Sequence, residues 1–64
     1  MKWVDVNEIA IELSEKYPET DPLSVLFTDL KRWVEALDGF EDDTDRCGEK
    51  VLEAIQMAWL DEVD

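Results

Sequence analysis

The amino-acid sequence predicts a small, compact all-α domain with three main helices and one short helical turn. Apolar residues recur at helical spacing in three stretches of the chain, and we find no convincing strand. Proline and glycine stand between these stretches, where helices usually end. A chain of 64 residues has room for one domain, so we expect a single domain over residues 1–64.

The first helix is expected over residues 6–16. Asp5 is placed to act as its N-cap, and Glu8 stands three residues later, where it can close a capping box. Pro18 stops the helical pattern. The apolar face predicted for this helix consists of Val6, Ile9, Ala10, Leu13 and Tyr17.

A short helical turn and a second helix follow. Asp21 and Pro22 are typical of an N-cap and a first helical residue, and the turn is expected to reach about residue 25. Thr28 and Asp29 are predicted to cap the next helix, which should end at residues 38–39 with Gly39 in a left-handed conformation. Its apolar face consists of Leu30, Trp33, Val34 and Leu37.

The last helix is expected over residues 48–62, after a solvated acidic loop at residues 41–45. Met57 and Leu60 lie off its main apolar stripe, which predicts that this helix is covered on two sides. Trp33 and Trp59 are predicted to be core residues, and Trp3 is predicted to fold back as a lid. The main stripe consists of Val51, Leu52, Ile55, Ala58 and Trp59.

The charge of the chain excludes several classes of partner. It has 18 Asp or Glu residues, six Lys or Arg and no His, which gives a net charge of −12. Affinity for nucleic acid or for anionic membranes depends on Lys and Arg, and Lys31 with Arg32 cannot overcome this acidic background. No apolar run approaches the roughly 20 residues that span a bilayer. A basic protein surface or a hard metal cation is the partner that the charge favours.

Cys47 is the only cysteine, so the chain forms no internal disulfide and cannot supply the four thiolates of a usual iron–sulfur cluster. A lone cysteine and the lack of an apolar signal segment near Met1 predict a cytoplasmic protein. With no histidine and only one cysteine, a closed zinc site is excluded, and nucleophile-and-base chemistry, which commonly needs histidine, is disfavoured. With no glycine-rich phosphate loop either, the sequence predicts a protein that is not an enzyme.

A second stripe, made of acidic residues, runs along the first helix. Its spacing of three, four, three and four residues places the first four members on one side, away from the apolar face. Carboxylates suit hard cations such as Mg, Ca, Mn and Fe(II), but a surface array lacks a preformed cage and should bind them weakly. The stripe consists of Asp5, Glu8, Glu12, Glu15 and Glu19.

Three interpretations of this stripe remain open at this point: a weak iron site, a docking strip for a basic partner, and a solvated face. The residues assigned to partner binding are Glu8, Glu12, Glu15, Glu19 and Asp29. The acidic loop is not an EF-hand, because Ala54 stands where a bidentate Glu would be required.

Short blocks along the whole chain resemble the IscX (YfhJ) family of bacterial iron–sulfur cluster assembly proteins. Blocks such as Phe-Thr-Asp, Leu-Glu-Ala-Ile and Trp-Leu-Asp-Glu are specific in combination. The matching positions are Lys2-Trp3, Glu8-Ile9, Tyr17-Pro18, Asp21-Pro22, Phe27-Thr28-Asp29, Trp33, Leu37, Phe40, Asp42-Asp43, Glu49-Lys50, Leu52-Glu53-Ala54-Ile55 and Trp59-Leu60-Asp61-Glu62.

The resemblance implies a compact helical fold related to winged-helix domains. It also implies binding of the cysteine desulfurase IscS, weak and non-structural binding of Fe(II) by surface carboxylates, and competition with bacterial frataxin. We therefore expect a monomeric acidic adaptor that regulates cluster assembly. The alternative is an acidic protein-interaction module or nucleic-acid mimic without a metal role.

Overall fold

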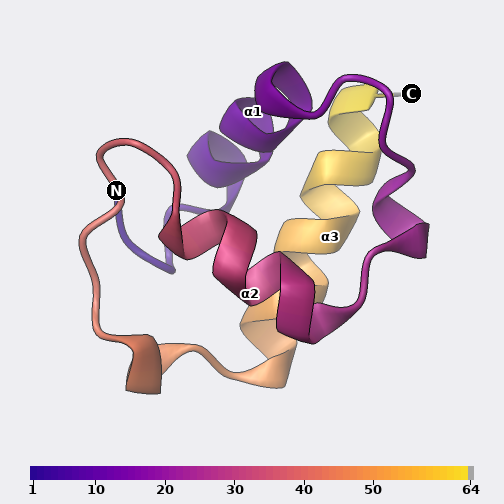
Figure 1. The fold of residues 1–64 in the computed structure, drawn as a ribbon. Helices are drawn as coiled ribbons and strands as arrows, with labels where there is room; N and C mark the ends of the chain where they lie inside the picture. The colour runs from indigo at the N-terminus through magenta and orange to yellow at the C-terminus, as the bar shows by residue number, and fades with distance from the viewer. Residues whose placement is uncertain (64) are drawn as a thin grey trace.

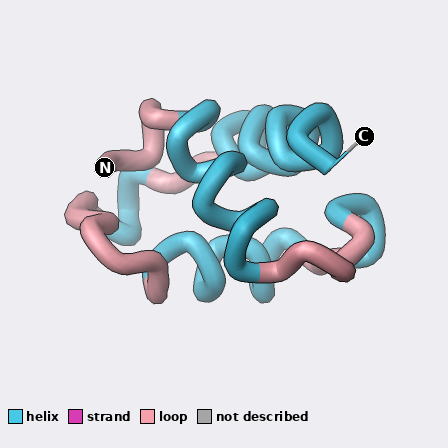
Figure 2. The backbone as a smooth tube through the Cα atoms, turned by 90° about the horizontal axis from the view of Figure 1, so that it is seen from above, coloured by secondary structure: helices cyan, strands magenta, loops and turns pink. Residues whose placement is uncertain are grey.

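Five helical elements make up the structure, a computed structural model that describes residues 1–63. They are α1 (Val6–Lys16), a 3-10 turn η1 (Pro22–Ser24), α2 (Phe27–Glu35), a second 3-10 turn η2 (Thr44–Arg46) and α3 (Glu49–Val63). Figures 1 and 2 show these helices joined by loops, with no strand in the described part of the chain. The predicted all-α class is confirmed. Because these residues form no strand, they provide no strand-built wing, and the winged-helix relationship stays a prediction.

The core lies where α1 packs against α3, with α2 and η1 closing its sides. The apolar faces predicted for the three helices supply most of it. None of the helices in residues 1–63 is long and apolar enough to cross a membrane. The buried residues of the core are Trp3, Ile9, Ala10, Leu13, Leu30, Val34, Leu37, Leu52, Ile55 and Trp59.

Helix α1 has the predicted bounds, but the predicted capping box is wrong. Asp5 occupies the N-cap position without capping the helix, because its carboxylate accepts the N–H of Lys2 at 2.7 Å. The Asp5 N–H in turn donates to the Lys2 carbonyl at 2.9 Å, so it is not free for Glu8. A tight turn over residues 2–5 therefore uses both groups that a capping box would need.

Helix α2 begins before the predicted cap at Thr28 and Asp29, so that prediction is wrong. Leu26 is the N-cap, in an extended conformation, and its carbonyl accepts the N–H of Leu30 at 2.8 Å. Phe27 opens the helix because its partly buried ring packs on the core. Asp29 consequently lies in the first helical turn, where the helix dipole favours an acidic side chain.

The end of α2 also differs from the prediction. The helix ends at Glu35 with Ala36 as C-cap, earlier than the expected end at residues 38–39. Gly39 does have a positive φ of 81°, but as part of a separate turn that the Phe40 N–H closes on the Leu37 carbonyl at 3.2 Å. This turn keeps Leu37 in the core and directs the chain back toward the N-terminus.

Aromatic side chains fill the space around the core. Trp3 is 1% exposed and meets Phe40 edge to face at 4.7 Å between ring centroids, so it is part of the core rather than a lid over it. Trp59 is fully buried, as predicted. Trp33 is only half-buried and stacks on Tyr17 at 4.3 Å. Trp3 and Phe40 thus join the N-terminal segment to the loop after α2, and a second group of rings, formed by Tyr17, Trp33 and Trp59, joins the three helices.

Helix α3 is less covered than predicted. Met57 is 51% exposed, on the outer face with Lys50, Glu53 and Ala54, where no described element covers it. Leu60 is half-buried. On the other side, the Gln56 amide donates to the Pro22 carbonyl at 2.9 Å and fastens η1 to the helix. The expectation of cover on two sides is therefore wrong at Met57.

Candidate functional site

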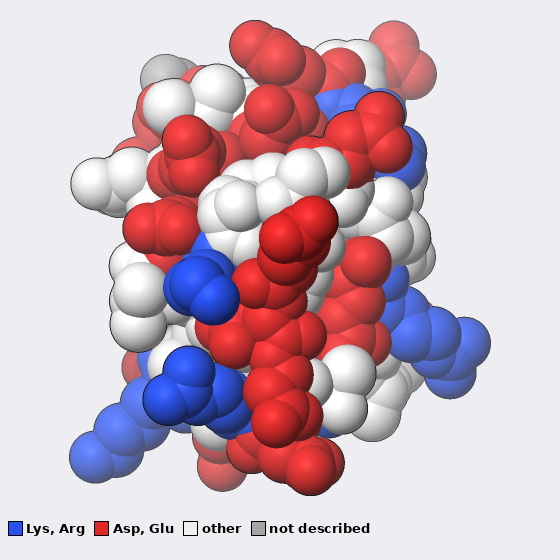
Figure 3. Space-filling view, turned by 90° about the vertical axis from the view of Figure 1, so that its left-hand side faces the viewer, with Lys and Arg blue, Asp and Glu red and all other residues white. Residues whose placement is uncertain are grey.

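An acidic strip, which we define as Glu8, Glu12 and Glu15, follows α1. All three side chains are exposed, on the side of the helix away from Ile9 and Leu13. Figure 3 shows acidic side chains down the face where the N-terminal segment and the loop after α2 lie, with basic side chains at its edges. No lysine or arginine forms an ion pair with the strip in residues 1–63.

Asp38 extends this acidic surface, although the sequence analysis did not assign it a role. It lines a shallow pocket together with Met1, Glu8, Glu12 and Gly39. The Met1 ammonium group donates to the Gly39 carbonyl at 2.6 Å and holds the loop there. No pattern along one helix could have indicated Asp38, because only the folded loop brings it to α1.

The other predicted site residues lie in different surroundings. Asp5 is half-buried, and its carboxylate is engaged by the Lys2 N–H. Glu19 is exposed but lies beyond the end of α1 and beyond Pro18. Asp29 is half-buried in the first turn of α2. The continuous part of the predicted stripe is therefore Glu8 to Glu15.

The acidic strip offers oxygen ligands without a closed cage. Within residues 1–63 no group of three or more His, Cys, Asp or Glu side chains is close enough together to hold a metal ion. Exposed carboxylates at helical spacing can attract a hard cation, but water would complete its coordination. The chemistry available here is weak, salt-sensitive attraction of hard cations and of basic surfaces.

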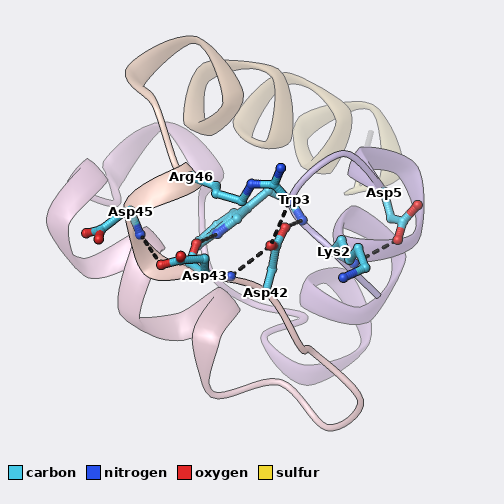
Figure 4. A network of polar contacts seen from close by, with 7 residues as sticks. All are labelled: Lys2, Trp3, Asp5, Asp42, Asp43, Asp45 and Arg46. Carbon is cyan, nitrogen blue, oxygen red and sulfur yellow. Dashed lines mark hydrogen bonds and ion pairs between the residues drawn. The ribbon is translucent and has the colours of Figure 1, made fainter.

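The loop predicted to be solvated at residues 41–45 holds a structural carboxylate instead. Asp42 accepts the N–H of Trp3 at 3.0 Å and the N–H of Asp43 at 2.8 Å (Figure 4), and its side chain is only 7% exposed. The Trp3 indole N–H donates to the Asp43 carbonyl at 3.0 Å. The prediction of a solvated loop is wrong at Asp42, which fastens the N-terminal segment to this loop.

Hydrogen bonding keeps the Asp42 carboxyl ionised. The N–H groups of Trp3 and then of Asp43 lower its pKa below the ordinary value of 3.8; burial opposes them, and the charges of Lys2 and Arg46 add to them. The Arg46 guanidinium is 3.8 Å away but 70% exposed, so this ion pair contributes little. Asp42 is thus committed to backbone donors and does not belong to the acidic strip.

Cys47 follows η2 and is half-buried. Burial raises the pKa of its thiol above the ordinary value of 9.0, with the charge of Lys31 acting against this shift and that of Glu35 adding to it. A thiol that stays protonated at neutral pH is a poor nucleophile and a poor metal ligand. We therefore assign no nucleophilic or metal-binding role to Cys47, and carboxylates remain the candidate functional groups.

Comparison with known proteins gives two findings. A family described as iron-sulphur cluster assembly matches residues 1–64. An uncharacterized protein of Pseudomonas aeruginosa is 61% identical over 64 residues, which cover 100% of this chain and 97% of that protein.

Proposed function

This chain belongs to the iron-sulphur cluster assembly family, and from that premise we propose that it is an acidic adaptor of a cysteine desulfurase. In this role it is an accessory protein rather than an enzyme, and it acts in the cytoplasm. The acidic strip of α1 docks on a basic patch of the desulfurase and presents or senses ferrous iron. The observation that carries this proposal is the exposed array of Glu8, Glu12 and Glu15, to which the fold adds Asp38.

Charge supports docking through this strip. The chain has a net charge of −12, and its core already uses most of its large apolar side chains. Complementary charge raises the association rate and aligns two surfaces without a large apolar contact. The family resemblance implies competition with bacterial frataxin, which would bind the same basic patch of the desulfurase. The adaptor would then regulate cluster assembly by occupying that patch.

Ferrous iron fits the same strip as a weakly held ion. Carboxylates suit Fe(II) as they suit other hard divalent cations, and exposed carboxylates discriminate poorly among them. We therefore expect Mn(II) or Ca(II) to compete. In this proposal iron is weakly held and has no structural role.

Surface plasmon resonance on immobilised desulfurase tests the docking face. Glu12→Lys with Glu15→Lys should lower the association rate by about tenfold or more, because complementary fields contribute 10- to 1000-fold to such rates. Glu53→Lys, on the outer face of α3, is the control and should have a much smaller effect. The association rate should also fall from low to physiological salt, where the Debye length is about 8 Å. A rate that does not depend on salt, or a greater loss from Glu53→Lys, would place the interface elsewhere.

An iron titration followed by NMR tests the metal role. Fe(II) should broaden signals along α1 around Glu8, Glu12 and Glu15. Changing all three to Gln should remove most of this broadening and leave helicity unchanged or slightly raised, since like charges four residues apart disfavour a helix. The control removes three exposed charges elsewhere, at Glu41, Glu53 and Glu62. If the variant with Gln at 8, 12 and 15 binds iron as well as the wild type, the strip is not the iron site. The alternative, an acidic interaction module without a metal role, would then be favoured.

A further inference from the structure

A second surface feature lies between α1 and α3. It is a groove of about 310 Å³ at the contact of these two helices. Residues from the first half of α1 form one wall, and residues from the last turns of α3 form the other. The lining residues are Asn7, Ala10, Ile11, Ala58, Asp61 and Glu62.

The centre of this groove is apolar and small. Ala10 is fully buried, and Ala58 is half-buried beside it. Ile11 is 45% exposed, although it is a large aliphatic residue in the middle of a helix. The two alanines and the exposed isoleucine together offer apolar contact area for a single aliphatic side chain.

The α3 wall of the groove is acidic. Asp61 and Glu62 are both exposed in the last turn of α3, and that turn has no basic residue. Carboxylates at a helix C-terminus are disfavoured, because the carbonyl groups there already carry a partial negative charge. A Lys or Arg side chain supplied from outside would meet both the carboxylates and the helix end. The groove thus selects for a cationic occupant.

The groove borders the acidic strip at Ile11 and opens on the other side toward α3. Ile11 stands three residues after Glu8 and four before Glu15, so it neighbours the strip, whereas Ala10 lies more than a third of a turn away from it. The opposite wall belongs to α3, whereas the pocket beside the strip includes Asp38 and Gly39 from the loop after α2. The α3 wall, with Ala58, Asp61 and Glu62, is therefore the part of the groove that the strip does not share.

We propose that the α1–α3 groove is a second docking surface, for a basic segment of a partner protein. One aliphatic side chain of that segment packs on Ile11 and Ala58, and its Lys or Arg side chains pair with Asp61 and Glu62. This goes beyond docking on the desulfurase through the acidic strip, because it assigns a binding role to the end of α3 and an aliphatic contact at Ile11.

NMR titration of the full chain tests this proposal with a defined probe. The probe is a synthetic peptide in which one leucine stands between two pairs of lysines. It should shift the amide signals of Ala58 and Asp61, on the α3 wall, more than those of Glu8 and Glu12 on the strip. Replacing the leucine by serine should weaken binding about fivefold, the effect of losing one partly buried aliphatic side chain. Equal affinity of the two peptides would overturn the proposal.

Variants of the chain separate the two faces. Asp61→Lys with Glu62→Lys should weaken peptide binding about tenfold, and Ile11→Ser should weaken it without loss of helicity by circular dichroism. Glu12→Lys with Glu15→Lys makes the same charge change on the strip and should have a smaller effect, because the lysines of the peptide pair with Asp61 and Glu62 on α3 rather than with the strip. Equal losses from the two charge reversals would mean that net charge alone attracts the peptide and that the groove is not a site. Desulfurase docking depends on the strip pair, so each proposal can fail without the other.

Discussion

The carboxylate of Asp42 joins two segments that are far apart in the sequence. It accepts the Trp3 N–H, and the indole of Trp3 donates to the next residue of the same loop, Asp43. Nearby, the Glu41 N–H donates to the Met1 carbonyl at 2.9 Å. In a chain with 18 acidic residues, this one is distinguished by its backbone donors and its burial, and neither can be read from the sequence.

We expect Asp42→Asn to lower the Tm by on the order of 5 °C near neutral pH, because two backbone donors lose a charged acceptor. The pKa of this carboxyl is lowered in the folded state. Its contribution to stability is therefore fully present above the unfolded pKa and is lost as the pH falls through the folded pKa. The difference in Tm between wild type and variant should accordingly be largest above about pH 5 and shrink below about pH 4. Thermal unfolding by circular dichroism across this range measures it.

Asp45→Asn provides the control for this prediction. Asp45 lies in the same loop, its side chain is exposed, and only its backbone N–H takes part in the network, donating to Asp43 at 3.0 Å. We expect it to change the Tm little at any pH. A Tm difference for Asp42→Asn that stays constant with pH would contradict a role for the ionised carboxylate.

At the scale of elements, the helices and the bounds of α1 followed from the sequence, whereas the capping interactions and the ends of α2 did not. Helix α1 occupies the predicted residues because Ile9, Ala10 and Leu13 need one buried face, and Pro18 cannot continue the helix. The cap failed because Asp5 can bond either to its own helix or to Lys2, and this choice depends on the turn before the helix. Helix α2 likewise begins where Phe27 reaches the core.

In the candidate site too, the part that repeats along one helix could be predicted and the part that depends on a loop could not. The acidic strip could be predicted because its members repeat along one helix, so their spacing alone places them together. Asp38 could not be predicted, because it depends on the turn at Gly39 that brings the loop back to α1. A contact that depends on a loop path leaves no periodic signal in the sequence.

The Gly39 turn allows a test at this scale. Its φ of 81° is disfavoured for residues with a Cβ, although no atom lies within 4 Å of the place where that Cβ would stand. We expect Gly39→Ala to destabilise the fold by about 1–2 kcal/mol through backbone strain alone. Gly48→Ala is the control: Gly48 also has open space but no positive φ, and because it is the N-cap of α3, where Ala is a poorer residue than Gly, only a smaller loss of about 0.5 kcal/mol is expected. Urea unfolding of both variants measures the difference, and equal stability of the two would contradict the argument.

For the whole molecule, one property bears on both stability and binding. With a net charge of −12 on 64 residues, the acidic side chains repel one another in the folded state. The one ion pair found in the described residues, between Arg46 and Asp42, does little to reduce this repulsion. The same charge would attract the basic partner that we propose. Salt should therefore act on the fold and on the proposed complex in opposite directions.

We accordingly expect the Tm to rise by several degrees when sodium chloride increases from low to about 0.5 M, because shorter Debye lengths screen the repulsion between exposed carboxylates. Desulfurase affinity should fall over the same range. The variant with Gln at 41, 53 and 62 carries −9 instead of −12, so its Tm should start higher and respond less to salt. Calorimetric scans of both proteins decide this. A Tm that falls with sodium chloride, or an equal rise in both proteins, would mean that charge repulsion does not limit this fold, and that the acidic surface reduces stability no more than a neutral one would.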